Sequence, residues 1–151
     1  MTGCEESLQK AEAALREAGD RLDQREGQAS GAEELAGIAK ERDGIADGMD
    51  QVADAWDKIA EDRDGAAEER DRQASKRDVE SAAEARALGV PDRGGVDRHH
   101  AAVLRDWAAG DRLDARADRL RAALARTAAR LVRRRAAADR DAAADRAPGA
   151  K

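Results

Sequence analysis

The stretch RDGAAEERDRQASKRD, residues 63–78, repeats an arginine–aspartate pair every seven residues. Ala67 and Ala74 each stand four residues after the arginine of a pair. The unit is Arg-Asp-x-x-Ala-x-x, and aspartate holds its second position without a gap from Asp43 to Asp78. The first and fifth positions alternate by four and three residues, so they line one narrow face of an α-helix. The spacing therefore predicts a long helix that packs against another helix along this face.

A second repeat reverses the pair and reads Asp-Arg-x-x-Ala-x-x. Arginine holds its second position from Arg98 to Arg140, and alanine holds its fifth from Ala101 to Ala143. Between the two repeats lies the short connection Gly89-Val90-Pro91-Asp92, whose glycine and proline are typical of a helix end. Long helices joined by so short a turn pack as antiparallel neighbours. The two repeats together predict an antiparallel helical hairpin.

The register of this hairpin follows from a turn centred near residues 90 and 91. With this turn, a residue of the first long helix lies opposite the residue of the second whose number makes the sum 181. Alanine at the fifth positions lets the two backbones approach, while long arginine stems cover the apolar face between them. Residues 1–88 carry 13 basic and 24 acidic side chains and residues 89–151 carry 15 and 9, so folding neutralises much of both. The predicted hairpin seam consists of Arg42 with Asp139, Arg63 with Asp118, Arg70 with Asp111, Met49 with Val132, and Trp56 with Ala125.

A shorter helix is expected before the hairpin. Leu8, Leu15 and Leu22 recur at heptad spacing, and Thr2 with Glu5 has the spacing of a capping box. Ser30 with Glu33 has the same spacing after the interruption at residues 27–31. The prediction is an all-α fold, a long antiparallel coiled-coil hairpin with an additional N-terminal helix. Its parts are an N-terminal helix and turn (1–30), an acidic helix (31–88), a turn (89–95), a basic helix (96–147) and a tail (148–151).

The composition favours long helices over a thick globular core. Charged residues make up 40% of the chain and aromatic residues 1%, with no Phe and no Tyr. Disorder is the competing interpretation, but a net charge of only −5 and strict periodicity favour helix. The sequence has no apolar run long enough to span a membrane and no secretory signal pattern, which predicts a cytoplasmic protein without membrane contact. Cys4, the only cysteine, is expected to be a free surface thiol.

Two apolar stripes lie outside the seam. One contains Ile38, Ile45, Val52 and Ile59, and the other contains Leu113, Ala117, Leu120, Leu124 and Leu131. The N-terminal helix, folded back, has the length to cover residues 38–52 and Leu131. Beyond its reach an uncovered leucine stripe indicates a partner. We therefore expect a homo-oligomer or a docked protein partner on a surface made by Ile59, Leu113, Leu120 and Leu124.

The ionisable side chains form no recognisable catalytic, cofactor-binding or metal site. His99 and His100 with Cys4 lack metal-ligand spacing, and Asp62-Arg63-Asp64-Gly65 resembles a calcium loop only in part. Trp56 and Trp107 are expected to be packing residues. The sequence thus predicts a protein that is not an enzyme and needs no cofactor.

The main alternative is a protein that binds nucleic acid or another polyanion. The candidate contact is the basic cluster formed by Arg126, Arg130, Arg133, Arg134 and Arg135. Two observations weigh against it: the opposing stretch near residues 49–57 is acidic, and neither tryptophan is interleaved with the cluster for base stacking. Neutralisation of the opposing helix is the preferred explanation for these arginines.

The arrays resemble the Arg-Asp-Ala heptad repeats of proteins from high-GC actinobacteria. The resemblance rests on Glu69-Arg70-Asp71-Arg72-Gln73-Ala74 and Ala117-Asp118-Arg119-Leu120-Arg121-Ala122, and it covers residues 39–146. Such arrays often precede output domains, including diguanylate cyclases of the GGDEF type, although this chain has no cyclase motif. The resemblance implies a scaffolding or signal-relay helix pair.

These features together predict a non-enzymatic coiled-coil interaction protein, a self-associating scaffold or a regulatory adaptor. The version favoured is a regulator that needs a partner protein. A polyanion-binding, nucleoid-associated protein is the alternative, and a stress-protective chain that folds only on drying is a further one.

Overall fold

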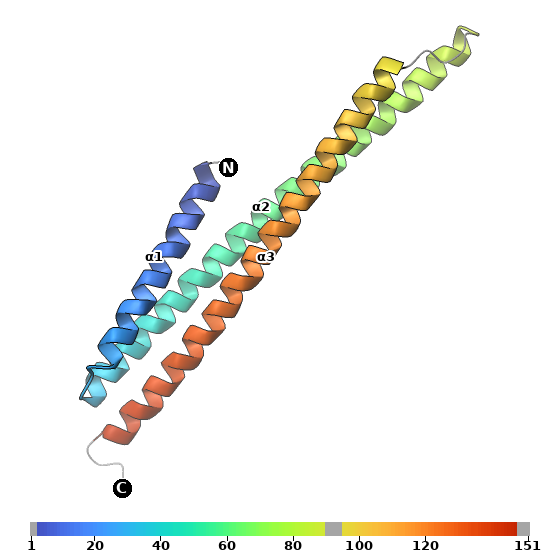
Figure 1. Ribbon diagram of the computed structural model, residues 1–151. Coiled ribbons are helices and arrows are strands. Elements are labelled where there is room, and N and C mark those ends of the chain that lie inside the picture. The colour runs from blue at the N-terminus through green and yellow to red at the C-terminus, as the bar shows by residue number, and fades with distance from the viewer. Residues whose placement is uncertain (1–2, 90–94, 148–151) are drawn as a thin grey trace. The chain divides into compact units, whose positions relative to one another are not determined.

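The computed structural model describes residues 3–89 and 95–147, and these residues form three helices and no strands. The helices are α1 (Gly3–Glu26), α2 (Ala32–Ala87) and α3 (Gly95–Arg146), shown in Figure 1. The predicted all-α fold is therefore confirmed. Thr2 of the expected first capping box, most of the expected turn and the expected tail lie outside the described residues.

The ends of α2 show how local chemistry starts and stops this long helix. At its start, the Oε2 of Glu34 accepts hydrogen bonds from the backbone N–H groups of Ser30 (2.9 Å) and Gly31 (3.3 Å). The capping carboxylate is thus Glu34, one residue beyond the expected Glu33, and it satisfies two N–H groups that have no partner inside the helix. After the end of α2, Gly89 has a φ of 59°, a left-handed conformation that glycine adopts without strain.

The described chain divides into two compact units. Unit 1 contains α1, the part of α2 up to Trp56 and the part of α3 from Leu120. Unit 2 contains the remainder of the two long helices, from Asp57 to Arg119. In each unit the contacts advance along α2 as they retreat along α3, so the two helices are antiparallel in both.

Unit 1 has an apolar core to which all three helices contribute. Its buried members are Leu22 from α1, Ile38, Ile45, Ala46 and Met49 from α2, and Ala129 from α3. Leu15, Ala18 and Val132 pack against this cluster. The N-terminal helix thus covers the α2 isoleucines as expected. It does not cover Leu131, whose side chain remains 58% exposed because α1 lies mainly against α2.

A glycine allows α1 to approach α2 closely. A Cβ built on Gly48 would lie 2.9 Å from Cδ2 of Leu15, closer than real side chains pack. Gly44 and Gly65, on the same helix, have open space at the corresponding position. Of these three glycines, only Gly48 has a packing reason to lack a side chain.

Unit 2 has an interior of alanines and charged side chains. Ala60, Ala67 and Ala74 of α2 and Ala101, Ala108 and Ala115 of α3 are fully buried. Within the described part of this unit, no apolar side chain larger than alanine is buried to this extent. Since alanine buries little apolar area, the ion pairs of this unit carry much of its specificity.

Candidate interaction surface

The predicted hairpin seam faces the interior in both units. All ten of its residues are buried or half-buried. In unit 1 Arg42 forms an ion pair with Asp139, and Met49 and Val132 belong to the same packed cluster. In unit 2 Arg63 pairs with Asp118, which is fully buried, and Arg70 pairs with Asp111. The structure thus contains the three ion pairs that the repeat register predicts.

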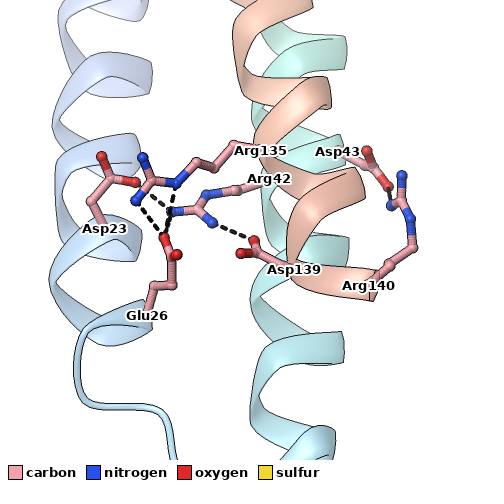
Figure 2. A network of polar contacts seen from close by, with 7 residues as sticks. All are labelled: Asp23, Glu26, Arg42, Asp43, Arg135, Asp139 and Arg140. Atoms are coloured by element: carbon pink, nitrogen blue, oxygen red, sulfur yellow. Dashed lines mark hydrogen bonds and ion pairs between the residues drawn. The ribbon is translucent and has the colours of Figure 1, made fainter. Parts of the chain in front are cut away.

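Arg42 is the centre of a polar network in which all three helices meet (Figure 2). Its guanidinium, 3% exposed, contacts Asp23 and Glu26 of α1 and Asp139 of α3, with 2.8 Å between Nη2 and the Glu26 carboxylate. Arg135 of α3 contacts the same Glu26 oxygen, with 2.8 Å from its Nη2 and 3.0 Å from its Nε. A buried guanidinium is tolerated when each donor has a partner, and here the partners come from two other helices.

The network shifts the pKa of two of its members, Glu26 and Arg42. Arg42 lowers the pKa of Glu26, and Arg135 lowers it further, while partial burial opposes the shift. Burial alone would lower the pKa of Arg42, but its hydrogen bonds to Glu26, Asp139 and Asp23 together raise it. Glu26 and Arg42 therefore each stabilise the ionised form of the other. Through these contacts the network joins α1 to both α2 and α3 in unit 1.

A second set of ion pairs, not predicted from the sequence, flanks the seam. It joins the second positions of the two repeats, with residue numbers that sum to 183. In unit 1 the pairs are Asp43 with Arg140 (2.6 Å) and Asp50 with Arg133 (2.7 Å). In unit 2 they are Asp64 with Arg119, Asp71 with Arg112, and Asp78 with Arg105. The sequence could have predicted these pairs, because aspartate holds every second position of the first repeat and arginine holds every second position of the second repeat.

The two tryptophans have different environments. Trp56 is fully buried, and the Arg121 guanidinium lies over its ring, 4.9 Å from the ring centroid to Cζ. Such a contact adds cation–π attraction to burial. Trp107, in contrast, is 60% exposed, so the expectation that it packs in the interior is wrong. Its neighbour Ala108 takes the position that faces α2.

Four leucines of α3 have exposed side chains. In unit 1 Leu120, Leu124 and Leu131 are 62%, 59% and 58% exposed, and in unit 2 Leu113 is 62% exposed. Ile59, the fourth residue of the predicted partner surface, is instead half-buried. The outward leucines of unit 1, Leu120, Leu124 and Leu131, are called the leucine ridge below.

Between α1 and α3 in unit 1 runs an open groove beside the leucine ridge. Its floor contains Met49 and Val52 of α2, and its α3 wall contains Leu124, Ala128 and Leu131. The α1 wall contributes further residues: Glu12, Leu15, Arg16, Gly19, Asp20 and Asp23. The base of the groove is apolar at Met49 and Val52, and charged side chains of α1, with Arg42 of α2 and Arg135 of α3, complete its lining. It continues the apolar surface of the ridge toward α1.

Of the five arginines predicted as a polyanion contact, three form ion pairs within the structure. Arg126 pairs with Asp54 (2.8 Å), Arg133 with Asp47 and Asp50 (2.8 and 2.7 Å), and Arg135 with Glu26 (2.8 Å). Arg130 and Arg134 are exposed and have no carboxylate partner among the described residues. Two of the five guanidinium groups therefore remain available.

The other candidate residues lie apart from this surface. Cys4 is exposed on α1. His99 and His100 are exposed in the first turns of α3, with ring centroids 6.3 Å apart. Over residues 3–89 and 95–147, none of the three helices combines the length and apolar character needed to cross a bilayer.

Comparison of the chain with protein-family models, with curated protein sequences and with solved structures finds no match.

Proposed function

We propose that this chain is a non-enzymatic helical interaction protein, a scaffold or regulatory adaptor that acts through the outward face of α3. The observation that carries the proposal is the exposure of Leu120, Leu124 and Leu131 beside a groove. Met49 and Val52 form the apolar part of its floor. Exposed apolar residues are common singly, but aligned residues beside a groove are typical of a protein interface.

The helical spacing of the ridge suits a helical partner. Leu120 and Leu124 are one turn apart, and Leu131 follows Leu124 by a full heptad, so the three side chains share one face of α3. An amphipathic helix laid along this face would bury its own apolar stripe against the ridge. The coiled-coil character expected of the protein would then extend from the seam between α2 and α3 to a contact with another chain.

Polyanion binding receives less support. Arg126, Arg133 and Arg135 are engaged by carboxylates of α1 and α2, so their charges are already balanced. A nucleic-acid site normally presents a continuous basic surface with several free phosphate contacts. The ridge also places leucines, not aromatic side chains, next to the two remaining arginines.

The test combines solution mass with a defined binding probe. The probe is a synthetic amphipathic helix with leucine at its seam positions and glutamine at its flanking positions. Sedimentation measures self-association, and fluorescence anisotropy measures binding of the labelled probe. The wild type should associate with itself, with the probe, or with both, and the variant Leu120→Ser with Leu124→Ser should lose this association while keeping its helical circular dichroism.

A matched control is provided by Val79→Ser with Leu88→Ser, which removes two apolar residues of similar exposure, 67% and 65%, from α2 and its C-terminal flank. This control should associate like the wild type. The proposal is wrong if the wild type neither self-associates nor binds the probe, or if both double variants behave alike.

A further inference from the structure

We infer that the leucine ridge receives an acidic amphipathic helix from a different protein, not a second copy of this chain. The inference rests on the proposed function and adds the charge of the partner. It follows from three features: the arginines of α3 that have no carboxylate partner, their position beside the ridge, and the charges that a second copy of the chain would bring to the ridge.

The first feature is a pair of arginines that the fold leaves without partners. Along the flank of α3 that faces α2, Arg133 and Arg140 each contact an aspartate of α2 in unit 1. Arg130 lies next to this flank, three residues before Arg133, and Arg134 lies farther round the helix toward Leu131. Both are exposed, and no carboxylate of the described residues contacts either of them. They are also four residues apart, a spacing at which like charges on a helix repel. A carboxylate from outside would relieve this repulsion.

The second feature is the position of these arginines beside the leucines. Arg134 is three residues after Leu131 and therefore its neighbour on the helix surface, while Arg130 directly precedes Leu131. Val132 and Arg135, on the other side of Leu131, line the groove toward α1. The ridge is thus flanked by the groove on one side and by free guanidinium groups on the other. A docked helix would direct its carboxylates to the side away from α1.

The third feature is the charge that a second copy would bring to the ridge, where α3 has no acidic residue between Arg119 and Asp139. The exposed large apolar residues of the described chain, apart from Val79 and Leu88, all lie on α3. A symmetric dimer through the ridge would place the arginine-rich α3 of one copy against the same helix of the other. Arg130 and Arg134 would then face like charges, a juxtaposition that specific interfaces avoid.

The exposed part of α2 offers no better complement on a second copy. Its outward carboxylates, among them Glu61, Asp62, Glu68 and Glu69, are spaced with Gly65 and polar residues instead of a leucine stripe. On the described part of α2, exposed carboxylates therefore do not flank a leucine stripe, and on α3 the exposed carboxylates of Asp141 and Asp145 follow the ridge instead of flanking it. The partner that combines acidic charge with an apolar stripe is a different protein.

The experiment compares three labelled helical peptides that differ only in their flanking residues, which are all Glu, all Gln or all Lys. Two exposed ion pairs predict that the Glu peptide binds the wild type about two- to thirtyfold more tightly than the Gln peptide. The Lys peptide should bind more weakly than both. The difference between the Glu and Gln peptides should shrink as salt is added.

The matched variants separate charge at the ridge from net charge. Arg130→Glu with Arg134→Glu should reverse the order, so that the Lys peptide binds best. Lys10→Glu with Lys40→Glu changes the net charge equally at exposed positions on α1 and α2, and it should keep the wild-type order. Each double variant should retain its helical circular dichroism.

Three outcomes would overturn the inference. Equal binding of the Glu, Gln and Lys peptides, still lost in Leu120→Ser with Leu124→Ser, would refute the acidic partner and leave the proposed function standing. Self-association of the wild type through the leucine ridge would replace the foreign partner with a second copy. Binding to random-sequence duplex DNA that requires Arg130 and Arg134 but not the leucines would assign these arginines to phosphate.

Discussion

Arg42 and Asp139 lie 97 residues apart in the sequence and form an ion pair in which each side chain is only 3% exposed. Asp23 and Glu26 of α1 contact the same guanidinium, so a single arginine joins the three helices of unit 1. Replacement of one member of a buried pair leaves the other as an uncompensated charge, which costs more than the intact pair contributes.

The substitution Arg42→Met should lower the free energy of unfolding by about 3 kcal/mol, because Asp139 would remain buried without its partner. Urea unfolding followed by circular dichroism measures this change. The combined variant Arg42→Met with Asp139→Leu should recover most of the loss, since both buried charges are then removed. A loss in the double variant equal to the sum of the losses of Arg42→Met and Asp139→Leu would show that the pair is not coupled.

Stability should also fall in acid because Arg42 and Arg135 hold the pKa of Glu26 below its ordinary value of 4.5. A carboxylate with a lowered pKa in the folded state stabilises the protein above its unfolded-state pKa, and this stabilisation is lost as the pH falls through the folded-state value. Glu26→Gln should therefore flatten the decline of the unfolding free energy below pH about 4.5. An identical pH profile for wild type and variant would contradict the role of this carboxylate.

Three glycines of α2 should respond differently to alanine. Gly44→Ala and Gly65→Ala place a methyl group in open space and should raise the unfolding free energy by up to about 1 kcal/mol each. Gly48→Ala gains the same helix propensity but must displace Leu15, whose Cδ2 lies 2.9 Å from the new Cβ position. Thermal unfolding should rank Gly48→Ala clearly below the other two. A similar gain at all three positions would mean that α1 does not pack on Gly48.

The alanine interior of unit 2 should tolerate no larger side chain. Ala108 is fully buried, whereas its neighbour Ala109 is exposed. Ala108→Leu should destabilise the protein by about 1–3 kcal/mol through overpacking, while Ala109→Leu should change stability little. Comparison of the two variants by urea unfolding tests how closely the helices approach, and equal effects would contradict the close approach.

Much of the fold was predictable because two signals agree in the sequence. Heptad spacing defines which face of each long helix is buried, and charge complementarity selects the register that pairs Arg42, Arg63 and Arg70 with their aspartates. Helix α2, which Glu34 caps and Gly89 follows, also begins and ends close to the positions that local chemistry indicates. Local pattern and long-range pairing point to one structure.

The features of the structure that were not predicted depend on side-chain directions, which the heptad spacing of the sequence alone does not define. The flanking pairs, such as Asp71 with Arg112, were missed because only the first positions of the repeats were matched. The exposure of Trp107 and Leu131 depends on how closely α1 and α2 approach α3, and a large apolar residue type does not reveal this. The Arg42 network was predicted only in its Asp139 contact, because the approach of Asp23 and Glu26 depends on the turn between α1 and α2.

The charge register turns one face of α3 to α2 and leaves the leucines of α3 outside. In unit 2 Asp111 contacts Arg70, and Leu113, two residues later and so on the opposite side of the helix, is 62% exposed. The most direct measurement is a double-mutant cycle at the neighbouring buried pair, with the unfolding free energy of Arg63→Asp, Asp118→Arg and their combination. Each single reversal should destabilise the protein, and the combined reversal should restore most of the loss. A combined variant as unstable as the sum of the two single variants would contradict the register and, with it, the exposed leucine surface.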